Sequence, residues 1–154
     1  MAVPISADDL AKKKATLRLC ELLALQKKVE HQFGGDDYNV FVFGSYLTTS
    51  FVERKSDIDI AVYTENFGLY KRLALYLEEY FAQKGVCSDI FYIDTTMEAP
   101  IYCVPLKSKV QFTDYFPDKL VVFHRAYGAI DVYRNTYEYC FDRHLLEKYT
   151  DKNV

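Results

Sequence analysis

The sequence predicts an α/β (α+β) fold in which helices flank a mixed sheet. Between residues 6 and 93 the residue patterns follow the order helix, strand, short helical turn, strand, helix and strand. The chain has 154 residues, 50% of them hydrophobic, which is enough for one compact domain with its own core. We therefore expect a single domain over residues 1–154, with an N-terminal helix at about 6–33, a central region at about 38–95 and a C-terminal segment at about 96–150 that is helical at its end.

The first predicted element is a long amphipathic helix. No Pro or Gly interrupts the chain between Ser6 and Phe33, and apolar side chains recur at helical spacings, at Leu10, Leu17, Leu22, Leu25 and Val29. Gly34 and Gly35 mark its end, because glycine readily adopts the left-handed conformation that terminates many helices.

Three strands and a second helix follow. Residues 39–43 are β-branched or aromatic apart from the first and run directly into Gly44 and Ser45. Residues 57–63 and 88–93 predict two further strands. Between them, helical spacing predicts a helix that ends near Gly85, from Leu69, Leu73, Leu77, Tyr80 and Phe81.

The segment after Thr95 has a weaker pattern. Pro100, Pro105 and Pro117 interrupt any long element, and Lys119 to Phe123 predicts a short strand. From Tyr127 onward, an aromatic stripe at spacings of three and four predicts a C-terminal helix, through Ile130, Tyr133, Tyr137, Phe141, Leu145 and Tyr149. That stripe fits either core packing or a surface that faces a partner.

Composition disfavours several classes of function. With 19 Lys and Arg against 22 Asp and Glu, the net charge of −3 gives no general attraction to nucleic acid. No stretch has the length of a membrane span, and the first residues lack the pattern of a secretory signal. The 4 cysteines are scattered without zinc-like spacing. We expect a cytoplasmic protein with reduced thiols that does not act at a membrane.

Two carboxylates lie on one face of the second predicted strand. Asp57 and Asp59 are two residues apart, so their side chains point the same way, and Asp89 begins the next strand. Like charges on one face repel each other, but divalent cations neutralise them, and Mg²⁺ prefers oxygen ligands. Three carboxylates suffice for two Mg²⁺ ions about 4 Å apart, as in attack at phosphorus. Asp94 is a rival to Asp89, although it lies at the exit of the strand.

A phosphate-binding turn is predicted at Gly44 and Ser45. These residues close one strand and open a short helical turn, which offers backbone N–H groups and a hydroxyl to an anion. Glycine also lets the backbone approach the anion closely.

The combination of Gly44-Ser45, eleven intervening residues, Asp57-Ile58-Asp59 and a later strand acid, Asp89, resembles the DNA polymerase β-like nucleotidyltransferase superfamily, in particular its minimal members. The resemblance covers about residues 39–95. It implies Mg²⁺-dependent transfer of a nucleoside monophosphate, with ATP as the expected donor. It also implies that Asp57, Asp59 and Asp89 ligate two Mg²⁺ ions, that Asp89 helps to activate the acceptor hydroxyl, and that Gly44 and Ser45 hold the terminal phosphates.

The residues after Gly44-Ser45 depart from the pattern of the minimal members. Those members commonly continue with an Arg-Ala-Arg-Gly-like stretch, whereas this chain has residues 46–50 as Tyr-Leu-Thr-Thr-Ser. Arg54 and Lys55 either substitute for the missing arginines or leave nucleotide binding weakened. Tyr46 is equally consistent with stacking on the base and with packing in the core or a lid.

The resemblance leaves three hypotheses about function. Minimal members resemble antitoxins that adenylylate a HEPN-type ribonuclease toxin, so a partner protein is the first expectation, with a second copy of the chain as another source of the acceptor surface. The alternatives are a catalytically weak subunit that acts by binding its partner, and an enzyme that modifies an aminoglycoside-type small molecule. A glycosyltransferase also uses an Asp-x-Asp motif but requires a longer domain and leaves Gly44-Ser45 unexplained.

Overall fold

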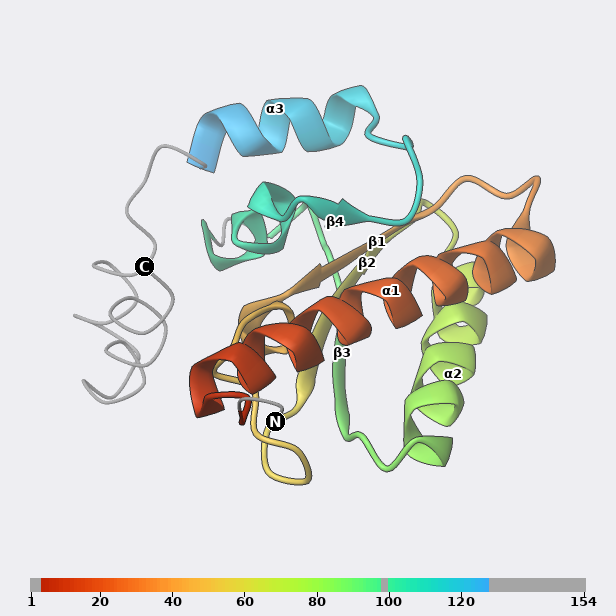
Figure 1. Ribbon diagram of the computed structural model, residues 1–154. Helices are drawn as coiled ribbons and strands as arrows, with labels where there is room; N and C mark the ends of the chain where they lie inside the picture. Colours follow the sequence, from red (N-terminus) through yellow and green to blue (C-terminus); the bar gives the residue numbers. More distant parts are fainter. Residues whose placement is uncertain (1–3, 98–99, 128–154) are drawn as a thin grey trace.

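A computed structural model describes residues 4–97 and 100–127 (Figure 1). The helices are α1 (Ala7–Phe33), α2 (Phe67–Gln83) and α3 (Asp118–Tyr127), and the strands are β1 (Asn39–Phe43), β2 (Ile58–Tyr63), β3 (Ser88–Tyr92) and β4 (Val110–Gln111). Short 3₁₀ helices are η1 (Gly44–Leu47), η2 (Pro100–Cys103) and η3 (Pro105–Lys107). The predicted element order as far as β3 is confirmed, with boundaries within two residues.

The four strands form one mixed sheet in the order β3-β2-β1-β4. β1 runs antiparallel to both β2 and β4, whereas β2 and β3 are parallel. The parallel pair is joined by α2, as the strand-helix-strand pattern requires. This topology brings the C-terminal end of β1 and the N-terminal ends of β2 and β3 to the same edge of the sheet.

Each face of the sheet has its own core. One face packs against α1 and α2 through strand residues that alternate along the chain, namely Val40, Val42, Ile58, Ile60 and Val62. The other face, with Phe41, Ala61 and Tyr63, packs against η2, η3 and α3. In Figure 1, α1 and α3 accordingly lie on opposite sides of β1 and β2.

Helix α1 covers the sheet only with its second half. Leu22, Leu25 and Val29 are buried, but Leu10 and Leu17 are 43% and 54% exposed. The apolar stripe predicted from the sequence therefore continues beyond the core. The first turn is held by Ser6, whose Oγ accepts a hydrogen bond from Asp9 N at 3.1 Å.

Helix α2 matches its predicted pattern closely. Leu69, Leu73, Leu77 and Phe81 are buried against the sheet. Asn66 caps the helix, because its Oδ1 accepts a hydrogen bond from Leu69 N at 3.1 Å.

The strand predicted at Lys119 to Phe123 was wrong, because this segment is part of α3. Leu120 and Phe123 are three residues apart and both buried, which a helix allows and an alternating strand does not. The carbonyl of Pro117 accepts hydrogen bonds from Leu120 N and Val121 N and so starts the helix. The helix predicted from Tyr127 onward lies outside the described residues, except for Tyr127 itself at the end of α3.

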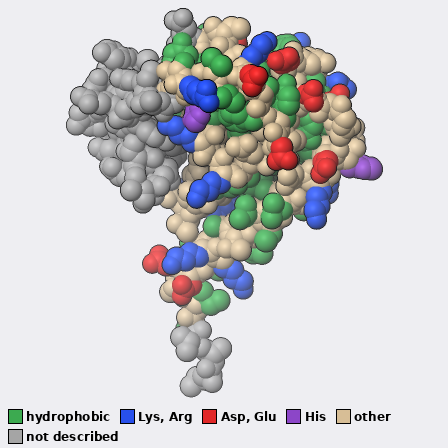
Figure 2. All heavy atoms as spheres, turned by 90° about the horizontal axis from the view of Figure 1, so that it is seen from above, with side chains coloured by type: hydrophobic (Ala, Val, Ile, Leu, Met, Phe, Trp, Pro, Cys, Tyr) green, Lys and Arg blue, Asp and Glu red, His purple; other side chains and the backbone are tan. Residues whose placement is uncertain are grey.

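Within residues 4–97 and 100–127, no helix combines the length and the apolar character needed to cross a membrane. Figure 2 shows Lys, Arg, Asp and Glu side chains interspersed over the face seen from above, without a large area of one sign.

Candidate active site

The predicted acids lie at the edge of the sheet where β1 ends and β2 and β3 begin. We call Asp57, Asp59 and Asp89 the acidic edge. Asp59 and Asp89 are direct partners in the register of the parallel strands, so their side chains leave the same face of the sheet. Asp57 immediately precedes β2, two residues before Asp59, and its place on that face stays a prediction from strand alternation. The strand pairing therefore brings together residues that are 30 positions apart.

The strand register pairs Asp59 with Asp89, but the carboxylates of the acidic edge do not converge on one point. Asp57 and Asp89 are exposed and Asp59 is half-buried. Among the described residues, no three His, Cys, Asp or Glu side chains converge into a group able to hold a metal ion. Neighbouring strands are about 4.8 Å apart, a backbone spacing that would allow Asp59 and Asp89 to share one cation. Acids directly opposite each other repel, which is a cost that such a cation would offset.

Gly44 brings the turn after β1 against Asp59. Its φ is +78°, in the region that favours glycine, and a Cβ added there would lie 2.1 Å from Asp59 Oδ2 and 3.1 Å from Asp59 Cγ. Only glycine leaves room for this close approach of backbone and carboxylate. The predicted short helical turn at Gly44-Ser45 is confirmed as η1, beside Asp59.

The remainder of η1 is an ordered turn. Ser45 is buried, and its carbonyl accepts hydrogen bonds from Thr48 N at 2.9 Å and from Thr48 Oγ1 at 2.8 Å. Ser50 N donates in turn to Thr48 Oγ1 at 3.1 Å. The chain therefore leaves the Gly44-Ser45 corner in one defined direction.

Tyr46 packs in the core and does not present its ring to a ligand. The residue is 3% exposed, and its ring makes edge contacts with Phe51 at 5.0 Å and Phe81 at 6.1 Å. Burial, reinforced by Glu21, raises the pKa of Tyr46 to about 12. Of the two roles that the sequence left open, the structure favours packing and gives no support to base stacking.

Arg54 and Lys55 lie on the exposed loop between η1 and β2. Arg54 adopts a positive φ of 67°. The carbonyl of Val52 accepts hydrogen bonds from Lys55 N and Ser56 N, which tightens this part of the loop into a turn. Both side chains are on the segment that leads into Asp57, and their contact with a nucleotide stays a prediction.

An aromatic cluster adjoins the acidic edge on the same face of the sheet. Phe43 is the register partner of Asp59, and its ring lies 5.8 Å from that of Phe91, which packs 5.8 Å from Tyr102. All three rings are half-buried. An apolar wall of this kind lowers the local dielectric, so it strengthens the attraction between the acids and a cation.

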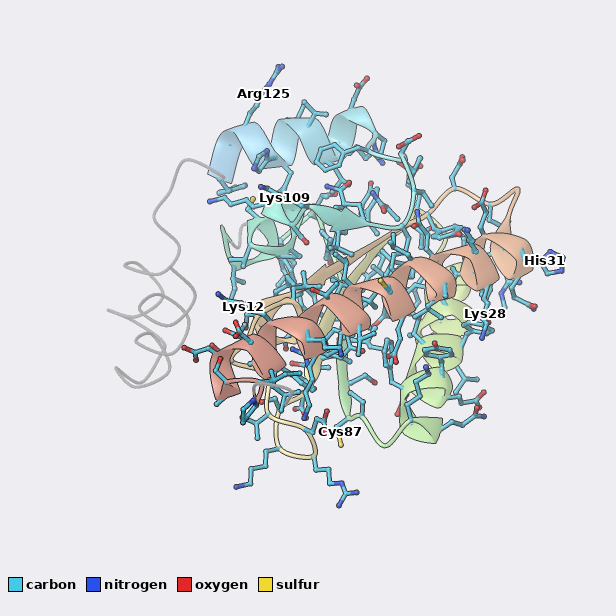
Figure 3. The ribbon with its side chains drawn as sticks, viewed as in Figure 1. Lys12, Lys28, His31, Cys87, Lys109 and Arg125 are labelled. Atoms are coloured by element: carbon cyan, nitrogen blue, oxygen red, sulfur yellow. The ribbon has the colours of Figure 1, made fainter. Side chains whose placement is uncertain are left out.

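Cys87, His31 and Asp94 are titratable residues outside the acidic edge, and they lie in different parts of the fold. Figure 3 places Cys87 beside the loop that leads into β2, and the Cys87 carbonyl accepts a hydrogen bond from Ile58 N at 2.9 Å. His31 lies in the last turn of α1, at the C-terminal end of that helix. Asp94 is beyond the end of β3, where hydrogen bonds from Thr96 lower the pKa of its carboxyl group. Asp94 is thus not on the strand edge that Asp89 occupies.

Arg18, which the sequence patterns did not single out, reaches this region from α1. Its guanidinium donates from Nε to the Tyr46 carbonyl at 2.9 Å and from Nη2 to the Thr48 carbonyl at 2.8 Å. A signal was present: Arg18 precedes Leu22 by four residues and Leu25 by seven, so it lies on the apolar stripe of α1. A charged residue in such a stripe needs a buried or half-buried partner.

Comparison with known proteins gives one match. The family model of the nucleotidyltransferase domain matches residues 22–118, which include α2, the whole acidic edge and all four strands. No curated protein and no solved structure matches the chain. The mixed sheet flanked by helices agrees with the nucleotidyltransferase fold, and nucleotidyl transfer is the general reaction that the match supports. The chain belongs to the nucleotidyltransferase domain family.

Proposed function

We propose that this protein transfers a nucleoside monophosphate, AMP from ATP, to a hydroxyl group on a partner protein, with Mg²⁺ bound at the acidic edge. The observation that carries the proposal is the register pair Asp59 and Asp89 with Gly44 packed against the Asp59 carboxylate. This juxtaposition supports the proposal, because phosphoryl chemistry needs oxygen ligands for a cation and backbone N–H groups for the phosphates.

The donor set at the acidic edge fits Mg²⁺. All three side chains are carboxylates. Hard oxygen ligands of this kind bind Mg²⁺ in preference to softer transition metals. Asp57, Asp59 and Asp89 would hold the ions. Bound Mg²⁺ supplies charge stabilisation for a phosphate that is attacked in line and for the departing pyrophosphate.

The residues of the chain have distinct roles in this reaction. Gly44 and Ser45 bind the β- and γ-phosphates, and Asp57 and Asp59 would hold the cation that neutralises the triphosphate. Asp89 helps to remove the proton of the acceptor hydroxyl. The acceptor oxygen then bonds to the α-phosphorus while the bond from that phosphorus to the bridging oxygen breaks and pyrophosphate leaves. Arg54 and Lys55 add positive charge near the triphosphate.

A transfer assay tests this proposal. The purified chain is incubated with Mg²⁺ and each of four nucleoside triphosphates labelled at the α-phosphate, and three acceptors are offered: the chain itself, a HEPN-domain ribonuclease and kanamycin. We expect label from ATP on the ribonuclease. Label on kanamycin alone would show that the acceptor is a small molecule and not a protein. Label on the chain itself would indicate transfer between copies.

Two variants test, in the same assay, whether Asp89 or its rival Asp94 is required for transfer. Asp89→Asn should abolish transfer, because it removes a cation ligand and the group that accepts the proton. Asp94→Asn is the matched control, since it neutralises an acid five residues further along, beyond the end of β3, without altering the strand edge. Equal transfer by native protein and Asp89→Asn would refute the role given to Asp89.

A second candidate function is neutralisation of a partner by contact alone. It is favoured by the absence, within the described residues, of a group of acids already gathered to hold a metal. If this function applies, the Asp57→Ala, Asp59→Ala variant inhibits the partner ribonuclease stoichiometrically and as well as the native chain does. If catalysis is required, that variant folds but fails to inhibit.

A further inference from the structure

The turn that begins at Gly44 depends on an anchor outside itself. η1 has only four residues and no side-chain hydrogen bond at its N-terminal cap. The internal bonds of the turn run between Ser45 and Thr48 and between Thr48 and Ser50. These bonds define the shape of the turn but not its orientation relative to the acidic edge.

Arg18 supplies a contact that fixes this orientation. Its Nε and Nη2 atoms hold two carbonyls of the same turn, at Tyr46 and Thr48, in the forked geometry that only arginine offers. The guanidinium also lies over the Phe51 ring at 4.8 Å and near the Tyr46 ring at 5.6 Å. Because it is half-buried between these groups, it has few alternative positions.

The direction of the held carbonyls matters for anion binding. The C=O and N–H groups of a trans peptide point in opposite directions, so holding these two carbonyls fixes the peptide planes that join residues 46 and 47 and residues 48 and 49. Ring packing adds a second constraint, since Tyr46 is wedged between Phe51 and Phe81. Gly44 and Ser45 directly precede these fixed peptides, and Gly44 lies against Asp59.

We propose that Arg18 is a positioning residue for the nucleotide site: it orients the Gly44-Ser45 turn from α1 without touching the nucleotide. This inference rests on the proposed function. It also describes how the chain works without the arginines expected after Gly44-Ser45, because an arginine from another element stabilises the turn through its backbone.

Three variants test the proposal. Arg18→Met keeps an apolar stem beside Phe51 but removes both hydrogen bonds. Arg18→Lys keeps the charge but loses the fork. Lys14→Met is the matched control, because it removes a cation one turn earlier on α1. Lys14 Nζ lies 3.9 Å from Glu53, in the loop between η1 and β2, and forms an exposed ion pair with it.

The readouts are the Kd of a Mg²⁺-bound non-hydrolysable ATP analogue and the hydrogen exchange of residues 44–56 without nucleotide. We expect Arg18→Met to raise the Kd by about tenfold or more, because small misplacement of a binding group is costly. Exchange in residues 44–56 should rise in the same variant. Arg18→Lys should recover part of the affinity, and Lys14→Met should behave like the native chain.

A stability-matched variant separates positioning from general destabilisation. Asn66→Ala removes the cap of α2, far from the turn in sequence, and should lower the melting temperature without changing the Kd. If Arg18→Met does not fold, Arg18→Lys carries the test, with an intermediate Kd and raised exchange expected. Native affinity and native exchange in a folded Arg18 variant would overturn this inference alone. Failure of the native chain to bind nucleotide would overturn the proposed function and this inference together.

Discussion

At the residue scale, the close approach of Gly44 and Asp59 gives the sharpest expectation. Gly44→Ala would place a methyl group 2.1 Å from Asp59 Oδ2, so the turn or the carboxylate must move. We predict that this variant folds but loses nucleotide transfer. The measurements are circular dichroism for folding and the labelled transfer assay for activity.

Gly85→Ala is the control for Gly44→Ala. Gly85 has a nearly equal φ of +74° but nothing within 4 Å of an added Cβ. Both variants carry the backbone strain of a left-handed alanine, about 1–2 kcal/mol. Only the variant at Gly44 disturbs an acid. Loss of transfer in both variants to the same extent would show that backbone strain, and not crowding of Asp59, is responsible.

Residues also show where the sequence carried enough information for the site and where it did not. The sequence pattern predicts the strands that carry Asp59 and Asp89, and the parallel register pairs these two residues. The side-chain direction of Asp57, which precedes β2, stays a prediction. The burial of Tyr46 could not be predicted, since a tyrosine after a glycine-serine turn fits either role. Arg18 was missed because its partners are backbone carbonyls about 30 residues away, and carbonyls carry no sequence signal.

At the scale of elements, the two helix caps should differ in their effect on stability. Asn66→Ala removes the cap of α2, whose buried face joins the core, so it should lower the free energy of unfolding by about 1 kcal/mol. Ser6→Ala removes the cap of an exposed first turn that can fray without global unfolding, so its effect should be smaller. Urea unfolding followed by circular dichroism compares them, and equal losses would contradict this account.

The elements that were predicted correctly are those with a long periodic pattern. Helix α1 and helix α2 have uninterrupted helical spacing, and β1 consists almost entirely of strand-forming residues. β4 has only two residues, too few for any period, and its pairing with β1 is a tertiary effect. Lys119 to Phe123 looked like a strand because Val121 and Val122 are β-branched, but burial of Leu120 and Phe123 favoured a helix.

At the scale of the whole molecule, buried tyrosines predict loss of stability in alkali. Burial raises the pKa of Tyr46 and of Tyr63 to about 12 from an ordinary 10.0, with smaller contributions from Glu21 and Glu65 respectively. Between pH 10 and 12 the unfolded chain releases these protons while the folded chain keeps them. Their contribution is therefore complete below pH 10 and is lost as the pH rises towards 12.

Urea unfolding at pH 9 to 12 measures this loss, with ultraviolet absorbance of phenolate as the second signal. Tyr46→Phe should make the free energy of unfolding fall less steeply with pH, because one of the tyrosines with the most strongly raised pKa is gone. An identical slope in the native chain and in Tyr46→Phe would show that Tyr46 ionises equally in the folded and unfolded states.

The central claim is that the acidic edge binds a nucleoside triphosphate through Mg²⁺. The most direct measurement is calorimetric titration with a non-hydrolysable ATP analogue, with and without Mg²⁺, because it requires no acceptor. The native chain is compared with Asp57→Asn, Asp59→Asn and with Asp36→Asn, Asp37→Asn. The last pair removes the same charge from exposed residues just before β1, at the other end of that strand.

Loss of a group that merely supports a metal ligand already costs about 10–100-fold in affinity, so loss of two direct ligands should weaken binding by about a hundredfold or more. We predict Mg²⁺-dependent binding by the native chain and by the Asp36→Asn, Asp37→Asn variant, and its loss in the Asp57→Asn, Asp59→Asn variant. Equal binding with and without Mg²⁺, or equal binding by all three proteins, would contradict the assignment of the acidic edge as the nucleotide site.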